Sequence, residues 1–292
     1  MKGVQIMKFK YYFFKENTRN FDRADLLEYL NETKYITLDM ETREAEKIAY
    51  YNNEDISLKA QFIIAEKSTI SSEKISPQYL DVNIRVEIDL LYPSYKLNKI
   101  LNIVETICKR YNLMIFNETF KDVMPFKREI CVKAYQLIKS AYKNKNEEEF
   151  MEYSKMDSLT LEHVYQYIEQ RDHLKEMYKD DNAEPVEFEF YRKPGARNAY
   201  VAAKWDGLNP FIIPQDAQLF IYDDGIIRKV ISFSCLLKNI NKYLEVIDSG
   251  LFTIYMLNPK AVKKVRKNIT KGKYPEPQVT LKMVDLNNIL DI

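Results

Sequence analysis

Hydrophobic and polar residues alternate along much of the first third of the chain, which is typical of β-strands with one buried face. The clearest run spans 82–90, where apolar residues occupy every second position (Val82, Ile84, Val86, Ile88 and Leu90). Shorter runs predict further strands at 7–14, 35–40, 46–51 and 56–64. Because polar residues hold the positions between, the pattern predicts a sheet with one wet face.

Apolar residues spaced three and four apart predict helices at 23–30, 96–111 and 129–142. Asp22 precedes the first of these and is a good N-cap. A short buried strand is expected at 113–116, so that strand, helix and strand form a β-α-β unit. A long helical pattern then covers 147–178, with an expected break near Asp157.

The second half returns to strand-like patterns after a polar segment at 179–185, which is the best candidate for a linker. Strands are expected at 186–191, 200–204, 219–222, 226–233, 252–257 and 278–284, and helices at 236–247 and 259–269. We therefore predict an α+β protein with a mixed or antiparallel sheet, helices on one face, a helical segment and a smaller C-terminal α+β module. The predicted domains are 1–182 and 183–292.

The composition of the chain argues against several classes of function. The 44 basic and 43 acidic residues leave a net charge of +1, so bulk charge points to neither nucleic acid nor membrane. None of the six glycines has the spacing of a phosphate-binding loop, and the three cysteines suit neither a disulfide scaffold nor a zinc site. The sequence shows no pattern of a signal peptide or a membrane span. We expect a cytoplasmic protein without cofactor or resident metal.

One set of carboxylates suggests an enzyme. The segment Asp39-Met-Glu41-Thr ends a predicted strand and resembles the first motif of DEDD-type 3′–5′ exonucleases, whose acids hold two divalent ions. Tyr153 and Asp157 match the Y-x-x-x-D third motif, and Asp122 lies where the second motif is expected. The spacing around Asp122 departs from the family, and Arg43 follows where the family has glycine. This two-metal exonuclease is the alternative interpretation.

A basic run at 260–273 suggests a different partner. It contains seven cations and no acid, and Ala261, Val262, Val265 and Ile269 form an apolar edge. Nucleic-acid binding through Lys260, Lys263, Lys264, Arg266 and Lys267 is a further alternative.

Aromatic residues are abundant, with 22 tyrosines, 15 phenylalanines and one tryptophan. Tyrosine and tryptophan are enriched where proteins bind proteins, because the ring buries area while its polar atom stays hydrogen-bonded. Tyr92, Tyr95, Trp205 and Tyr222 are the candidate anchors for a partner. Trp205 alternatively covers the core of the second half.

Several segments resemble a group of uncharacterised bacterial proteins, some of which look like immunity proteins that neutralise secreted toxins. The segments that carry this resemblance are Tyr50-Tyr-Asn-Asn53, Val86-Glu-Ile-Asp-Leu-Leu-Tyr-Pro-Ser94, Asn112-Leu-Met-Ile-Phe116 and Lys204-Trp-Asp-Gly207. The resemblance implies a protein that binds another protein, and no catalytic residue can be carried over from it. Our preferred interpretation is accordingly a non-enzymatic binding protein, with shape and charge complementarity as its means of recognition.

Overall fold

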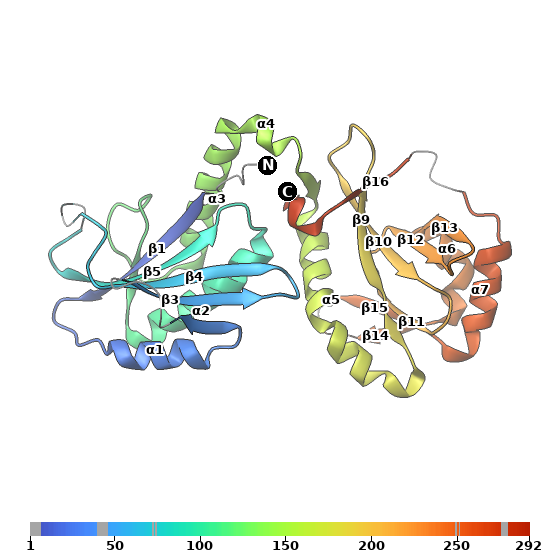
Figure 1. Ribbon diagram of the computed structural model, residues 1–292, viewed down its shortest axis with the longest axis horizontal. Coiled ribbons are helices and arrows are strands. Elements are labelled where there is room, and N and C mark those ends of the chain that lie inside the picture. Colours follow the sequence, from blue (N-terminus) through green and yellow to red (C-terminus); the bar gives the residue numbers. More distant parts are fainter. Residues whose placement is uncertain are drawn as a thin grey trace. The chain divides into compact units, whose positions relative to one another are not determined.

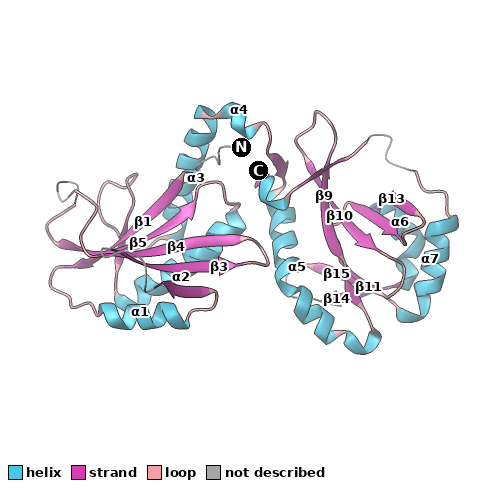
Figure 2. Ribbon diagram, viewed as in Figure 1, coloured by secondary structure: helices cyan, strands magenta, loops and turns pink. Residues whose placement is uncertain are grey.

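The computed structural model describes residues 7–39, 46–71, 73, 75–248, 250, 252–275 and 280–292. The chain divides into two compact units, Met1–Glu147 and Glu148–Ile292. Both units contain helices and strands (Figure 1, Figure 2). The predicted α+β class is confirmed, whereas the boundary between the units lies well before the predicted position at 182/183.

Unit 1 contains an antiparallel sheet of six strands in the order β2-β3-β4-β5-β1-β6. Its elements in chain order are β1 (Lys8–Glu16), α1 (Arg23–Glu32), β2 (Ile36–Asp39), β3 (Glu46–Asn53), β4 (Leu58–Ala65), β5 (Tyr79–Asp89), α2 (Ser94–Tyr111), β6 (Met114–Phe116) and α3 (Arg128–Lys145). Strand β1 lies between β5 and β6, so the predicted β-α-β unit is split by the first strand of the chain.

The two faces of this sheet differ as the alternating pattern predicts. Val86 of β5 is fully buried and pairs with Tyr11 of β1, whose hydroxyl donates to the Cys131 carbonyl of α3 at 2.7 Å. On the opposite face, Arg85 forms ion pairs with Glu87 at 2.9 Å and with Glu46 at 3.1 Å. Helix α3 thus covers the apolar face, while the other face carries surface charge pairs.

The short α4 (Glu147–Phe150) leads into unit 2, which has a five-stranded sheet ordered β13-β12-β10-β9-β16 and a four-stranded sheet ordered β14-β15-β11-β8. The further strands are β7 (Ser154–Met156), β8 (Glu184–Pro185), β9 (Glu187–Arg192), β10 (Ala199–Trp205), β11 (Phe211–Pro214), β12 (Leu219–Asp223), β13 (Arg228–Ser232), β14 (Leu244–Asp248), β15 (Thr253–Leu257), β16 (Lys282–Val284) and β17 (Ile289–Asp291). The helices are α5 (Ser158–Met177), α6 (Phe233–Ile240) and α7 (Val262–Lys271), and short 3₁₀ turns are η2 (Lys179–Asp181), η3 (Asn241–Tyr243), η4 (Pro259–Ala261) and η5 (Leu286–Asn288).

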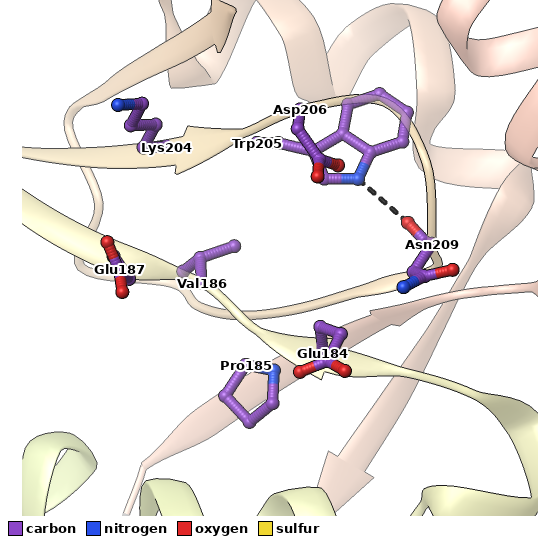
Figure 3. Close-up of a pocket in the computed structure, with 8 residues that line it drawn as sticks. All are labelled: Glu184, Pro185, Val186, Glu187, Lys204, Trp205, Asp206 and Asn209. Atoms are coloured by element: carbon purple, nitrogen blue, oxygen red, sulfur yellow. Dashed lines mark hydrogen bonds between the residues drawn. The ribbon is translucent and has the colours of Figure 1, made fainter. Parts of the chain in front are cut away.

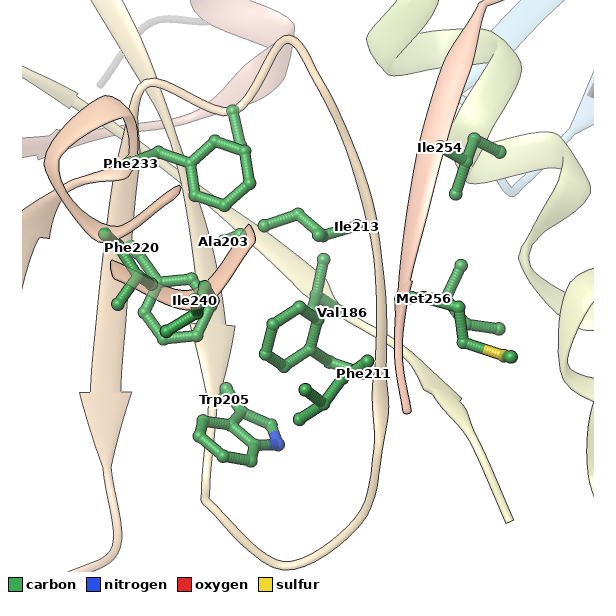
Figure 4. Close-up of a cluster of buried hydrophobic side chains, with 14 of the residues drawn as sticks. Val186, Ala203, Trp205, Phe211, Ile213, Phe220, Phe233, Ile240, Ile254 and Met256 are labelled. Carbon is green, nitrogen blue, oxygen red and sulfur yellow. The ribbon is translucent and has the colours of Figure 1, made fainter. Parts of the chain in front are cut away.

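Both sheets of unit 2 contribute to one apolar core (Figure 4). Trp205 packs edge-on against Phe211, with ring centroids 5.3 Å apart, and Phe220 stacks on Phe233 of α6. Each of these two sheets contains one parallel pair, β10 with β12 and β11 with β8, so both sheets are mixed. The prediction of a mixed or antiparallel sheet therefore holds in both units.

The long helical pattern at 147–178 is interrupted more strongly than predicted, because β7 separates α4 from α5. Helix α5 belongs to the core of unit 2. Tyr167 of α5 is fully buried and donates its hydroxyl to the carbonyls of Ile212 at 2.8 Å and Val186 at 3.2 Å. The predicted linker at 179–185 is instead the turn η2 followed by β8, which pairs with β11. These contacts place α5 in unit 2.

Two further segments differ from the sequence prediction. The helix expected at 236–247 ends at Ile240, and 244–248 forms the strand β14, which pairs with β15. The strand expected from 226 begins only at Arg228, which leaves Ile226 in the turn before it. In the first case, hairpin pairing with the next strand overrides local helix propensity.

Two glycines allow a matched test of the backbone in unit 2. Gly207 and Gly225 both have φ of +82°, where a side chain costs about 1–2 kcal/mol. A Cβ at Gly207 would lie 2.7 Å from Cε2 of the buried Tyr222, whereas one at Gly225 would meet nothing within 4 Å. We therefore expect Gly207→Ala to lower the free energy of unfolding by about 2–4 kcal/mol and Gly225→Ala by about 1 kcal/mol. Urea unfolding monitored by circular dichroism measures both. Equal losses would contradict the tight contact at Gly207.

Candidate binding surface

Helix α7 presents the densest charge on unit 2. The 3₁₀ turn η4 leads directly into this helix, and Asn258 caps η4 by accepting the Lys260 amide N–H at 3.0 Å. Val265 and Ile269 are fully buried in the core of unit 2, so one side of the helix is anchored. At 100° per residue, positions 264, 267 and 271 then point away from that core.

The cations of α7 are exposed, and so are Lys260 in η4 before the helix and Lys273 after it. Arg266 forms an ion pair with Asp224 at 3.4 Å. Six other cations are exposed and form no ion pair with any residue that the structure describes; these are Lys260, Lys263, Lys264, Lys267, Lys271 and Lys273. We call this set, together with Arg266, the cationic face of α7. It concentrates positive charge in a chain whose net charge is only +1.

This arrangement is unfavourable for the helix taken alone. Lys263 and Lys267, Lys264 and Lys267, and Lys267 and Lys271 are like charges three or four residues apart. Each such pair destabilises a helix by about 0.2–0.5 kcal/mol. At the C-terminal end of α7 a positive charge is stabilising, because the Lys229 ammonium donates to the carbonyls of Ile269 at 3.0 Å and Thr270 at 2.8 Å.

A rigid hairpin tip adjoins the cationic face. The Asp224 carboxylate accepts the Tyr222 hydroxyl at 2.6 Å and the backbone N–H groups of Ile227 at 2.8 Å and Ile226 at 3.1 Å. The hydroxyl of Tyr222, these amides and Arg266 together lower the pKa of Asp224 to about 2. The Arg266 guanidinium also donates to the Tyr222 hydroxyl at 3.1 Å, which ties the β12–β13 turn to α7.

Two of the four predicted aromatic anchors are buried, which corrects that prediction. Trp205 is 5% exposed and Tyr222 is 0% exposed, so both belong to the core and neither ring is available to a partner. The hydroxyl of the half-buried Tyr92 accepts from Lys59 N and donates to Lys59 O, both at 3.0 Å. Tyr95 is half-buried on α2, where Lys99 lies over its ring at 5.1 Å. The alternative interpretation of Trp205, as part of the second core, is the one that the structure supports.

The carboxylates of the exonuclease alternative are separated within unit 1. Asp39 is the last residue of β2, at one edge of the sheet. A row of paired residues crosses the sheet from Asp39 to Phe116 of β6, at the opposite edge; the residues between them are Ile48, Ile63, Arg85 and Tyr12. Five strand spacings of about 4.8 Å separate the two ends of this row. Val123, which follows Asp122, packs with Phe116 at the β6 end. Asp39 and Asp122 therefore do not converge on a pair of metal ions.

The remaining residues of that alternative have local structural roles or are not described. Asp122 accepts from the Ser76 hydroxyl and from the Val123 amide at 2.7 Å, and the Ser76 contact contributes most to its lowered pKa. Asp157 is the N-cap of α5 and accepts the Thr160 amide at 3.0 Å. The Tyr153 carbonyl accepts from the Arg197 guanidinium at 3.3 Å. Glu41 lies outside the described residues.

A pocket of about 430 Å³ opens beside β8 and β10 (Figure 3). Its lining comprises Glu184, Pro185, Val186, Glu187, Lys204, Trp205, Asp206 and Asn209. The Trp205 indole N–H donates to the Asn209 carbonyl at 2.8 Å, and Glu184 pairs with Lys175 at 2.9 Å. These polar groups already have protein partners, so we assign the pocket no ligand.

A histidine–carboxylate contact links distant segments of unit 2. His163 Nδ1 of α5 lies 2.9 Å from Asp216 Oδ2, which is in the loop between β11 and β12. The imidazole ring stacks on Phe252, with ring centroids 5.1 Å apart. No local pattern indicates this pair, because 53 residues separate its members. It holds α5 against the sheet that contains β11.

Within the described parts of the chain, no three His, Cys, Asp or Glu side chains are grouped so that they could hold one metal ion. No described helix has both the length and the apolar character that a bilayer crossing requires. Comparison of the sequence and the structure with protein-family models, curated proteins and solved structures finds no match.

Proposed function

We propose that this chain is a non-enzymatic binding protein that docks an acidic surface of another protein through the cationic face of α7. The observation that supports the proposal is a group of six exposed lysines without a described ion pair, four of them on the short helix α7 and the other two, Lys260 and Lys273, directly before and after it. Complementary charge steers association and sets the orientation of docking. An immunity protein that covers the active surface of a toxin-like partner in the cytoplasm is the form of this function that the sequence resemblance favours.

The energetics of α7 also support a role in binding. Helices exposed only to water commonly mix both signs of charge, and opposite charges three or four residues apart stabilise them. Lys263, Lys264 and Lys267 of the cationic face lack this stabilisation, because the segment 260–273 contains no acidic residue. An acidic partner would reduce the repulsion among these lysines. This relief would make the binding free energy more favourable.

The test uses two charge-reversed variants of the full chain. Lys264→Glu combined with Lys267→Glu changes the cationic face, and Lys238→Glu combined with Lys242→Glu changes two exposed lysines elsewhere in unit 2. The probe is an immobilised polyglutamate peptide, and biolayer interferometry gives Kd at low and physiological salt. We expect the first variant to lose affinity by about tenfold or more and the second by less than about threefold.

Two controls make the result decisive. In the first variant the glutamate introduced in place of Lys267 would precede Lys271 by four residues, so we expect its stability to equal or slightly exceed that of the parent protein. A DNA duplex of matched charge is the second probe. Equal losses in both variants, or tighter binding to the duplex than to the peptide, would contradict docking on an acidic protein; the latter would favour the nucleic-acid alternative.

A further inference from the structure

Ile226, close to the cationic face, is an apolar residue whose side chain is almost completely exposed to solvent. Ile226, at the tip of the β12–β13 hairpin, is 93% exposed, the largest exposed fraction of any large hydrophobic side chain in the described residues. Single exposed apolar residues are ordinary on protein surfaces. What distinguishes Ile226 is the degree of order in the backbone that carries it.

Hydrogen bonds hold this tip from both sides of the turn. Asp223 Oδ1 accepts the Gly225 amide at 3.2 Å, and the Asp224 amide donates to the Ile227 carbonyl at 3.3 Å. The Asp224 carboxylate accepts the amide of Ile226 itself. The hydrogen bonds therefore hold the backbone that carries Ile226 in one conformation, and little backbone entropy remains to be lost when it binds.

The tip and the cationic face form one surface. Arg266 joins them through its contacts with Asp224 and with the Tyr222 hydroxyl, and Lys229 of β13 donates to the last carbonyls of α7. In Figure 1, α7 lies beside the strands of this hairpin. Binding sites on proteins commonly combine an apolar anchor with a polar or charged surround, and this surface contains both parts.

We propose that Ile226 is the apolar anchor of the docking surface, and that the partner is an acidic protein surface with an apolar patch at its centre. The inference rests on the proposed function, because it concerns the same surface and the same kind of partner. The cationic face attracts acidic surfaces over a distance, whereas Ile226 selects among them, because only a surface with apolar side chains at its centre gains free energy by burying it.

Two peptides of about twelve residues distinguish electrostatic attraction by the lysines from the apolar contact made by Ile226. One is all glutamate, and the other has two central leucines among the glutamates. Three full-length proteins are compared: the parent, Ile226→Ser, and Leu208→Ser as the matched control, since Leu208 is 66% exposed elsewhere in unit 2. We expect the parent and Leu208→Ser to bind the leucine-containing peptide about fivefold more tightly than the all-glutamate peptide.

The result expected for Ile226→Ser is equal affinity for the two peptides, with affinity for the all-glutamate peptide unchanged. If Ile226→Ser retains the fivefold preference, or if the parent shows none, the anchor is refuted while the cationic face stands. If the parent binds neither peptide, the proposed function fails as well. Loss of the preference in Leu208→Ser as well would show a general effect of surface polarity and would also refute the anchor.

Discussion

A fragment comprising residues 148–292 is expected to fold cooperatively, whereas one comprising 183–292 is expected to remain unfolded. The shorter fragment lacks α5, and with it Tyr167 and Leu174, which belong to the core of unit 2. It also removes the Tyr167 hydroxyl from the carbonyls of Val186 and Ile212, of which Ile212 keeps the Val186 amide as a donor. A buried acceptor that loses its donor costs about 1–3 kcal/mol, in addition to the apolar burial that is lost.

The C-terminal end of the chain adds a second reason. Strand β17 pairs with β7, and the Ile292 carbonyl accepts the Ser158 hydroxyl at 3.1 Å. A cut at 183 removes both partners of this segment. Far-ultraviolet circular dichroism and urea titration of the two fragments measure the outcome. A sharp unfolding transition in the fragment 183–292 would show that the linker predicted from sequence is the true boundary.

Trp205→Ala is expected to lower the free energy of unfolding of unit 2 by about 3–5 kcal/mol, because it opens a cavity in the core. The indole packs edge-on against Phe211 and Tyr222, with centroids 5.3 and 5.9 Å away, and its N–H donates to the Asn209 carbonyl. A surface anchor would behave in the opposite way, since its loss would weaken binding and leave stability unchanged.

The matched control for this variant is Leu208→Ala, three residues further along in the loop that follows β10 and largely exposed. We expect it to change stability by no more than about 0.5 kcal/mol. Chemical denaturation followed by circular dichroism suits both variants, because Trp205 is the single tryptophan and its removal abolishes tryptophan fluorescence. A loss below about 1 kcal/mol in Trp205→Ala would restore the surface interpretation of this residue.

The pattern of the sequence predicts the elements of unit 1 closely, for a physical reason. In β5, burial alternates with the apolar positions from Val82 to Ile88, since the sheet has one covered and one wet face. Asp22 caps α1 as predicted, accepting the Ala24 amide at 2.8 Å. Both features depend only on residues near one another in the chain, so local periodicity and capping chemistry are sufficient to identify them.

Prediction is weaker where pairing with another segment decides the outcome. The segment 244–247 has a helical pattern, yet hairpin pairing with the neighbouring strand β15 makes it a strand. The pattern at 147–178 contains no proline or glycine, yet β7 interrupts it by pairing with β17 at the other end of the chain. The hydrophobic pattern of a short segment does not show that it will pair with a strand more than a hundred residues away.

The candidate surface shows the same division between local and long-range information. The charges of α7 and its apolar edge can be found in the sequence, and the Asp-Asp-Gly motif at 223–225 indicates a tight turn. Which side chain the turn exposes could not be found there, because Ile226 resembles the first residue of the strand that follows. The contact between Arg266 and Asp224, 42 residues apart, is what joins turn and helix.

The order of polar and apolar residues was enough by itself to determine an α+β protein, the strands and helices of its first half, and an amphipathic helix with all of its charge of one sign. The tertiary structure alone decided that α5 belongs with the second core, that Trp205 and Tyr222 are buried, and that Ile226 stands in solvent beside the cationic face. The reason is that periodicity reports only that a residue has an apolar side, whereas burial depends on which distant segments pack against it.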